Sequence, residues 1–165
     1  MSNTENFECG YVYRIYAHAN GKDLIFREEE NYKYFLNKLA KYIIPIAEIY
    51  AYCLMPNHFH LLLRFKNLDQ ILNEDEHKYL MKQFSNLLNG YAKAYNKRYN
   101  RKGSLFLDYL KRKRVNDEKY LRKLFHYIHN NPVNHGLLKI LMIGNIHLII
   151  LILIWLKKAK LKELK

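Results

Sequence analysis

The sequence predicts an α+β domain in which helices pack on an antiparallel sheet. Stretches rich in β-branched and aromatic residues alternate along the chain with amphipathic stretches of helical period. Two of the strand-like stretches are separated only by Met55, Pro56 and Asn57, and strands joined so closely pair antiparallel. The chain has 165 residues, of which 50% are hydrophobic, so it can bury the core of one domain.

Three strands and one helix are predicted in the first part of the chain. The first strand ends where Asn20 and Gly21 favour a turn. The helix begins in an acidic run, which the positive end of a helix dipole favours, and it stops before Pro45. The predicted strands are 11–18, 46–54 and 58–65, and the predicted helix is 29–43.

Two helices and one strand are predicted in the second part. Asn116 and Asp117 suit the N-terminus of a helix, and Pro132 is expected to end that helix. The apolar stripe of this last helix is expected to consist of Leu121, Leu124, Phe125 and Ile128. The predicted helices are 76–99 and 118–130, and the predicted strand is 104–115.

The chain is strongly basic. Lysine and arginine number 28 against 15 aspartate and glutamate residues, which gives a formal net charge of +13. So strong a positive charge on a small domain favours a polyanionic partner, of which nucleic acid is the natural example. Compositional drift is the alternative, because the chain is also rich in asparagine, isoleucine, lysine and tyrosine.

The cysteine pattern and the N-terminal residues indicate in which cellular compartment the protein works. Cys9 and Cys53 are the only two cysteines, lie far apart in the sequence and form no CxxC pair, which favours a reducing environment. The first residues lack the basic start and the apolar core of a secretory signal. We therefore expect a cytoplasmic protein, which would be associated with the nucleoid if DNA is its nucleic-acid partner.

Two histidines begin the third predicted strand. Alternation places His58 and His60 on one face of that strand, while Phe59 and Leu61 point to the other. A strand that served only burial would not carry imidazoles at two successive positions of one face, because their nitrogens need partners when desolvated. Two imidazoles about 7 Å apart along a strand can converge on one divalent ion. Two partly exposed histidines at a strand end are the alternative interpretation.

The last predicted helix carries a tyrosine and a carboxamide that point the same way. Tyr127 and Asn131 are spaced i,i+4 on one flank of the apolar stripe. Tyrosine is a poor nucleophile at neutral pH, but a divalent ion that polarises a phosphodiester allows it to attack. Asn131 would add an oxygen to the nitrogens of His58 and His60, a mixed ligand set that suits Mg²⁺ or Mn²⁺. The sequence thus predicts a metal site with a phenolic nucleophile beside it.

Other residues of this helix compete for these roles. Tyr120 lies on the same flank as Tyr127 and is the alternative nucleophile, although it is farther from Asn131 along the helix. His126 and His129 point elsewhere, where contacts with solvent or phosphate are expected. An interface tyrosine that covers the sheet is the alternative interpretation of Tyr127.

Two basic stretches are candidates for contact with DNA. The first, at the end of the long helix, mixes cations with tyrosines, which suits single-stranded nucleic acid, and a solvated helix end is the alternative. The second ends the last strand, where four consecutive cations must occupy both faces and cannot all line one groove. A solubilising edge strand is the alternative there. The candidate DNA-binding residues are Lys97, Arg98, Arg101, Lys111, Arg112, Lys113 and Arg114.

Three motifs in this order resemble those of single-tyrosine HUH transposases, in particular the REP-associated tyrosine transposases and their insertion-sequence relatives. The first motif is the His-hydrophobic-His strand within residues 55–63. The second is 103–106, and the third is 127–136, which is similar to the family's tyrosine-bearing helix and its Asn-Pro-Val exit. Residues 20–26 also resemble the family's first hairpin, and the resemblance covers about residues 10–138.

The resemblance implies a ferredoxin-like α+β domain of the HUH endonuclease type with a central antiparallel sheet. It implies that His58 and His60 hold the metal and that Asn131 completes its ligands. It also implies that Tyr127 attacks single-stranded DNA, forms a 5′-phosphotyrosine and frees a 3′-OH, and that the reverse attack rejoins strands without ATP. Members of the family recognise DNA hairpins and several act as dimers, so hairpin or single-stranded DNA is the expected partner and a homodimer is allowed.

The last part of the chain departs from the family. Residues 1–138 are assigned to the transposase domain, whereas the tail, 139–165, is apolar and then rich in lysine, without the polar Trp and Ser-Ser-Tyr segment of the family. Its apolar run, 146–156, which includes His147, is shorter than the roughly 20 residues that span a bilayer, so no membrane partner is expected. We interpret the tail as frameshifted or degenerate, and another reading frame beyond codon 138 should then restore the polar segment.

Two rival functions stay open at this stage. The unusual tail motivates a DNA-hairpin binding protein in which catalysis has lapsed, and its apolar run motivates a membrane-associated basic protein. The presence of all four candidate site residues argues for an enzyme. We therefore predict a transposase or endonuclease that cleaves and rejoins single-stranded, hairpin-associated DNA. The four residues are His58, His60, Tyr127 and Asn131.

Overall fold

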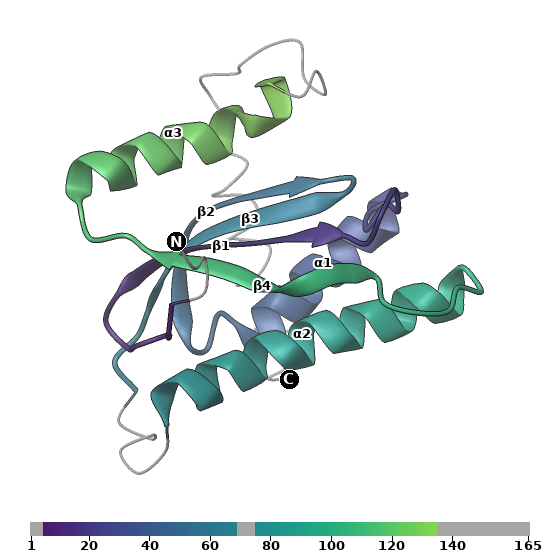
Figure 1. The fold of residues 1–165 in the computed structure, drawn as a ribbon, viewed down its shortest axis with the longest axis horizontal. Coiled ribbons are helices and arrows are strands. Elements are labelled where there is room, and N and C mark those ends of the chain that lie inside the picture. Colours follow the sequence, from purple (N-terminus) through teal and green to yellow (C-terminus); the bar gives the residue numbers. More distant parts are fainter. Residues whose placement is uncertain (1–4, 69–74, 135–165) are drawn as a thin grey trace, which may run out of the picture. The chain divides into compact units, whose positions relative to one another are not determined.

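Strands and helices follow one another as β1-α1-β2-β3-α2-β4-α3 in the computed structural model, which describes residues 5–68 and 75–134 (Figure 1). Every predicted element is present, with ends that differ from the prediction by a few residues. The strands are β1 (Val12–Ala19), β2 (Ala47–Met55), β3 (His58–Phe65) and β4 (Phe106–Arg114). The helices are α1 (Glu29–Tyr42), α2 (Glu76–Arg98) and α3 (Glu118–Asn134).

The four strands form one antiparallel sheet in the order β2-β3-β1-β4. A β-α-β-β-α-β chain with this strand order has the ferredoxin-like arrangement, so the predicted fold class is confirmed. β2 and β3 form the antiparallel pair that their short connection predicted. β3 also pairs with β1, which places the first strand beside the histidines of the third.

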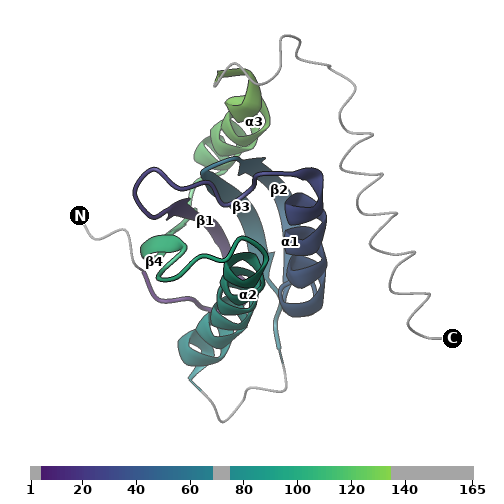
Figure 2. The same cartoon turned by 90° about the vertical axis from the view of Figure 1, so that its right-hand side faces the viewer.

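One face of the sheet, which we call the core face, carries the main apolar core. Helices α1 and α2 cover it (Figure 2). Every second residue of β1 and β3 points into this core, as strand alternation requires. Complete burial of one such aliphatic or aromatic side chain stabilises the fold by about 1.5–3 kcal/mol. The strand residues buried there include Tyr13, Ile15, Phe59, Leu61, Leu63 and Phe65.

The opposite face, which we call the histidine face, holds a smaller apolar cluster and the candidate site. Leu124 and Ile128 of α3 are buried in this cluster, so α3 packs on the side of the sheet that α1 and α2 leave open. These packing statements concern the compact unit that ends at His129. The strands contribute Ala51, Cys53, Met55 and Leu62 to the cluster.

Two predictions about α3 are wrong. The helix continues to Asn134 instead of stopping before Pro132, because a proline close to a helix end removes only one backbone hydrogen bond. Phe125 is 39% exposed and does not belong to the buried stripe. The stripe is narrower than predicted, since Leu124 and Ile128 lie one turn apart whereas Phe125 is rotated by about 100° from Leu124.

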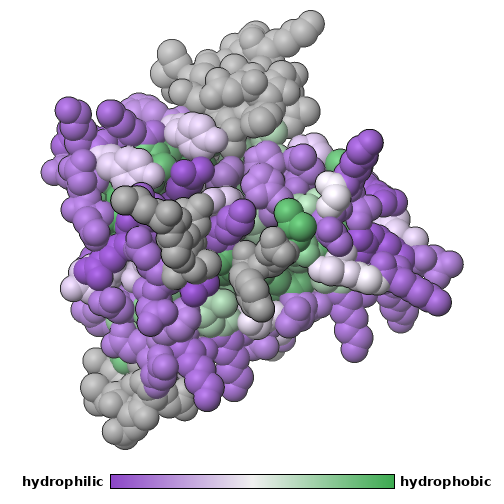
Figure 3. Space-filling view, in the orientation of Figure 1, coloured by the Kyte–Doolittle hydropathy of each residue, from purple (hydrophilic) through white to green (hydrophobic). Residues whose placement is uncertain are grey.

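Several further predictions concern the surface and the ends of the chain. Hydrophilic side chains cover most of the face seen in Figure 3, in line with the basic composition. Within residues 5–68 and 75–134, no helix is long and apolar enough to cross a bilayer. The predicted domain boundary at residue 138 and the tail, 139–165, lie outside the described residues.

Candidate metal and tyrosine site

His58 and His60 lie side by side on the histidine face, as strand alternation predicted. Their ring centroids are 5.1 Å apart and their planes are inclined by 82°. The two side chains are only 6% and 4% exposed, so the alternative of two partly exposed histidines is wrong. A pair of buried imidazoles at this separation can supply two nitrogen ligands to one metal ion.

The turn before His58 is tied to the end of β1. The carbonyl oxygen of Pro56 accepts hydrogen bonds from the amides of Ile25 and Phe26, at 2.7 and 3.0 Å. The carbonyl oxygen of Asn57 accepts a 2.7 Å bond from the amide of Ala19. These bonds hold the start of β3 in place, so His58 is presented from a fixed backbone rather than from a loose loop end.

A side-chain hydrogen bond selects the tautomer of His58. Its Nδ1 lies 2.8 Å from Oδ1 of Asn57. Because an amide oxygen only accepts, the ring donates from Nδ1 and carries its lone pair on Nε2. A neutral imidazole oriented in this way is the form that binds a metal, and such an outer partner fixes both its tautomer and its direction.

β1 adds a tyrosine and a third histidine that the sequence analysis did not single out. In the β1–β3 register Tyr16 lies opposite His60 and His18 lies opposite His58. The rings of His18 and His58 stack, with centroids 4.9 Å apart and planes 23° apart. Burial, and then the charge of Lys111, lower the pKa of His18, which favours its neutral form. Alternation along β1 could have placed His18 on a face, but only the strand pairing shows that this is the face of His58.

Tyr127 reaches the histidine pair from α3. Its ring centroid lies 6.1 Å from that of His60, and the two rings meet edge to face at 77°. The guanidinium carbon of Arg14 lies 5.4 Å from the same tyrosine ring. Tyr127 is 42% exposed, so a polymer substrate can reach it. The buried side chains of Leu124 and Ile128, on either side of Tyr127 in sequence, hold this part of α3 on the sheet.

The remaining candidates on α3 are less fully described. Tyr120, the alternative nucleophile, is half-buried and packs against the apolar cluster of the histidine face. His126 is exposed. Asn131 lies in α3, but its side chain and that of His129 fall outside the described residues. In the part of the chain that is described, no three histidine, cysteine, aspartate or glutamate side chains are grouped so that they could hold a metal ion.

The four consecutive cations of β4 divide between the two faces, as predicted. Pairing with β1 places Lys111 opposite Tyr16 and Lys113 opposite Arg14, on the histidine face. Arg112 and Arg114 lie on the core face, so of these four cations only the two lysines share a face with the candidate site.

Arg112 and Arg114 make contacts within the protein. Arg112 is 7% exposed, its Nε donates a 2.5 Å bond to the carbonyl oxygen of Glu5, and its guanidinium carbon lies 5.1 Å from the ring centroid of Phe7. Arg114 forms a 3.2 Å ion pair with Glu8. A role of these two arginines in DNA binding remains a prediction, and their contacts serve the fold.

The basic residues at the end of α2 also differ in their surroundings. Arg98 forms a 2.8 Å ion pair with Glu28. Arg101 pairs with Asp23 and donates a 2.8 Å bond to the carbonyl oxygen of Ser104. Lys97 is exposed. Arg101 therefore ties the end of α2 to the loop before β4, while Lys97 is open to solvent.

Comparison with known proteins supports the fold. No protein-family model matches the sequence, and no curated protein matches it. Among solved structures, the chain is similar to a REP-associated tyrosine transposase bound to a REP hairpin. The TM-score is 0.64, the sequence identity is 17%, and the match covers 86% of this chain and 78% of that one. At this identity the similarity shows a shared fold.

Proposed function

We propose that this chain is a metal-dependent transposase and nickase that cleaves and rejoins single-stranded, hairpin-associated DNA through a covalent 5′-phosphotyrosine. Tyr127 is the nucleophile, and His58, His60 and Asn131 hold Mg²⁺ or Mn²⁺. The contact between the rings of Tyr127 and His60, 6.1 Å apart beside the imidazole of His58, carries this proposal. It brings a potential nucleophile close to two imidazoles that can bind a metal ion, and holding reacting groups near one another contributes to enzymatic rate enhancement.

The chemistry is a transesterification in which the number of phosphoester bonds is conserved. When bound, the divalent ion polarises the phosphodiester and stabilises its developing negative charge. The phenol oxygen of Tyr127 forms a bond to phosphorus while the bond from phosphorus to the 3′ oxygen breaks. The phenol proton passes to solvent and the 3′ oxygen takes up a proton. Attack by a 3′-OH on the phosphotyrosine reverses these steps and rejoins strands without ATP.

Arg14 supports the nucleophile in this proposal. Its guanidinium lies close to two tyrosine rings, with its central carbon 5.1 Å from the ring centroid of Tyr16 and 5.4 Å from that of Tyr127. Its Nε is buried and has no hydrogen-bond partner within the described part of the chain. We assign it to the phosphate at which Tyr127 reacts, because a fixed cation there stabilises negative charge on both the phenol oxygen and the phosphate.

Two lysines and the overall charge support DNA as the substrate. Lys111 and Lys113 lie on the histidine face, where they can contact phosphates on either side of the reacting one. The formal net charge of +13 favours a polyanionic partner. Hairpin association is carried over from the solved transposase, which was bound to a REP hairpin.

A covalent adduct assay tests the proposal. The protein is incubated with hairpin DNA that carries a single-stranded extension, in the presence of Mn²⁺, and adducts are resolved under denaturing conditions. DNA labelled at its 3′ end should give a labelled adduct, whereas label at the 5′ end should leave with the fragment that ends in a 3′-OH. Tyr127→Phe should abolish the adduct, because the attacking oxygen is gone.

Tyr120→Phe is the matched control, since it removes the same hydroxyl from the other candidate on the same helix. It should retain the adduct. Loss of the adduct in Tyr120→Phe but not in Tyr127→Phe would contradict the assignment. Tight binding of the hairpin by the wild-type protein without any adduct would instead indicate a DNA-hairpin binding protein in which catalysis has lapsed.

A further inference from the structure

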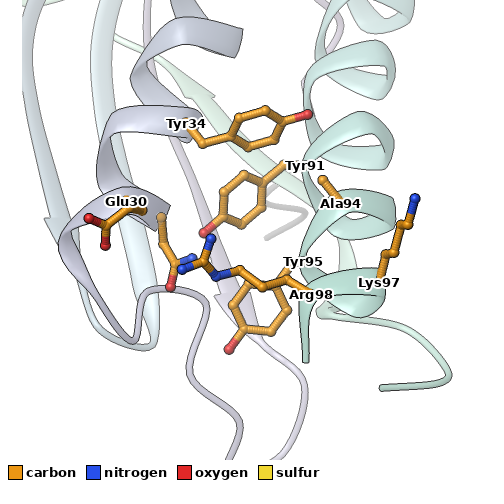
Figure 4. Close-up of a pocket in the computed structure, with 8 residues that line it drawn as sticks. Glu30, Tyr34, Tyr91, Ala94, Tyr95, Lys97 and Arg98 are labelled. Carbon is orange, nitrogen blue, oxygen red and sulfur yellow. The ribbon is translucent and has the colours of Figure 1, made fainter. Parts of the chain in front are cut away.

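A second candidate site lies between α1 and α2, on the core-face side of the sheet. The two helices are in contact there, and a cavity of about 510 Å³ lies between them (Figure 4). This volume is within the range of sites that take small organic molecules, roughly 300–1,000 Å³. The residues that line the cavity include three tyrosines and three charged residues, which are Tyr34, Tyr91, Tyr95, Glu30, Lys97 and Arg98.

Two of the three tyrosines have hydroxyls that are already bonded within the protein, so they offer ring surface rather than hydroxyl donors. The hydroxyl of Tyr91 donates to the carbonyl oxygen of Ile25, and that of Tyr95 donates to the carbonyl oxygen of Leu24. Both rings are therefore held in place, and both are almost fully buried. Tyr34 is 38% exposed, and its ring centroid lies 6.1 Å from that of Tyr91, with planes 31° apart. An exposed ring backed by a fixed one is a platform on which a planar ligand can stack.

The charged residues supply groups for a phosphate and for a hydrogen-bond donor. Lys97 is exposed, and Arg98 is half-exposed while its Nε is held by Glu28 at 2.8 Å. Figure 4 shows Arg98 reaching from α2 across the cavity towards α1. Glu30, on α1, is also exposed and carries a carboxylate that only accepts hydrogen bonds. Aromatic faces beside cations are the pattern that binds unpaired nucleotides.

We propose that this cavity binds one unpaired nucleotide of a DNA strand whose base carries an exocyclic amino group. The base stacks on Tyr34, its amino group donates to the carboxylate of Glu30, and the flanking phosphate contacts Lys97 and Arg98. Adenine, cytosine and guanine carry such an amino group, whereas thymine does not. The inference rests on the proposed function for the identity of the polymer as DNA, and it adds a base-binding site on the side of the sheet opposite to Tyr127.

Binding of homo-oligonucleotides to the full chain tests this site without any cleavage. Fluorescein-labelled dC, dA and dT oligonucleotides of one length are titrated in the absence of divalent metal, and anisotropy gives each Kd. Wild-type protein should bind dC and dA at least about fivefold more tightly than dT, the lower end of the usual discrimination from one base-edge contact. Glu30→Ala should bring the three affinities together.

Tyr34 and Lys97 have matched controls in the same helices. Tyr34→Ala should weaken binding of every oligonucleotide by about fivefold or more, the usual effect of losing one stacked base, whereas Tyr34→Phe should bind as the wild type does. Lys97→Ala should weaken binding and lower its salt dependence. Lys93→Ala, one helical turn away, exposed and outside the cavity, should not.

The outcomes separate this proposal from the proposed function. Wild-type affinity of Tyr34→Ala for all three oligonucleotides overturns the site, and equal wild-type affinities for dC and dT overturn the role of Glu30. Equal effects of Lys97→Ala and Lys93→Ala overturn the assigned phosphate contact. Failure of Tyr127→Phe to abolish the DNA adduct would overturn the catalytic proposal alone, because the anisotropy measurement involves neither that tyrosine nor a metal.

Discussion

The core face and the histidine face of the sheet are built from alternate residues of the same strands, yet their chemistry differs. On the core face, β3 contributes Phe59 and Leu61, which are completely buried among apolar side chains. On the histidine face, the neighbouring positions are His58 and His60, and the ring of His60 meets that of Tyr127. Because a strand has a period of two, one strand serves packing and chemistry without a compromise between them. Stability and reactivity should therefore respond to different substitutions.

β4 shows the same contrast with cations. The arginines of the core face are held by the protein, Arg112 over Phe7 and Arg114 by Glu8. A planar guanidinium stacks on rings and forms several directed bonds, so arginine suits a partly buried position. The face that would meet DNA carries lysines instead, and exposed lysines can follow a mobile phosphate backbone.

The largest expected effect is that Phe59→Ala and His60→Ala damage different properties. The first should reduce stability, and the second should abolish activity. Phe59→Ala removes a completely buried ring and should lower the free energy of unfolding by about 3–5 kcal/mol. His60→Ala should cost about 1 kcal/mol, the usual effect of a single substitution, yet abolish the DNA adduct. Urea unfolding followed by circular dichroism measures the first quantity, and the adduct assay measures the second.

An adduct assay at low temperature completes the comparison of Phe59→Ala with His60→Ala. Under conditions in which Phe59→Ala is still folded, it should form the adduct, because its side chain lies on the face away from Tyr127. An equal loss of unfolding free energy in both variants, or an active His60→Ala variant, would contradict the separation of the two faces.

A smaller effect is expected from Asn57→Ala, which removes the partner of His58 Nδ1 at 2.8 Å. Loss of such an outer partner typically weakens metal binding by about 10–100-fold. Titration calorimetry with Mn²⁺ measures this affinity directly. Asn57→Asp keeps an oxygen acceptor and should retain binding, and Asn86→Ala, an exposed position on α2, should be neutral. Undiminished Mn²⁺ affinity in Asn57→Ala would show that His58 needs no such partner.

Protonation of His77, which lies beside the core, should change the stability of the protein rather than its activity. His77 accepts a 3.0 Å bond from the amide of Phe7 at Nδ1, and its Nε2 lies 3.4 Å from Nη2 of Arg112. Burial, and then the charge of Arg112, lower the pKa of His77 from its ordinary value near 6.5. The unfolded chain therefore binds a proton before the folded one does. Stability should be complete above about pH 6.5 and decrease as the pH falls from there towards the lower folded pKa.

Unfolding free energies at pH 7.5 and 5.5 test this expectation. His77→Asn keeps an acceptor for the amide of Phe7 but cannot be protonated, so it should lose less stability between these values than the wild type. His126→Asn, at an exposed position of α3, should keep the wild-type dependence. A His77→Asn variant that loses as much as the wild type would assign the acid sensitivity to other groups.

The features of the two faces that could be predicted from the sequence are those that depend on the regular repeat of a strand or a helix. Alternation along β3 was enough to place His58 and His60 on one face, and the same rule divided the cations of β4. Helical spacing was enough to place Tyr127 on a flank of α3, beside its buried stripe. These inferences succeed because backbone geometry alone determines which side chains share a face.

The parts that could not be predicted depend on which elements meet. His18 and Arg14 join the site only because β1 pairs with β3, a contact between residues far apart in the chain. Tyr34 faces Tyr91 only because α1 packs against α2. Arg112 is a further case, since no sequence pattern indicated that Phe7 and Glu5 would cover it. Long-range register and packing decide such contacts, and a single sequence carries no local signal for them.

The smallest expected effect concerns a polar group on the core face. The hydroxyl of Tyr52 is buried without a hydrogen-bond partner in the described part of the chain, and burial raises its pKa to about 12. Tyr52→Phe removes this unpaired group and should leave the free energy of unfolding unchanged or raise it by up to about 1 kcal/mol. Tyr13→Phe is the matched control, because the Tyr13 hydroxyl donates 2.9 Å to the carbonyl of Asn6 and accepts 3.0 Å from the amide of Glu8. That variant should lose about 1–3 kcal/mol, since it removes both of these hydrogen bonds. Equal losses in both variants would mean that the Tyr52 hydroxyl is stabilised by an interaction of its own, and the core face would then tolerate polar groups as the histidine face does.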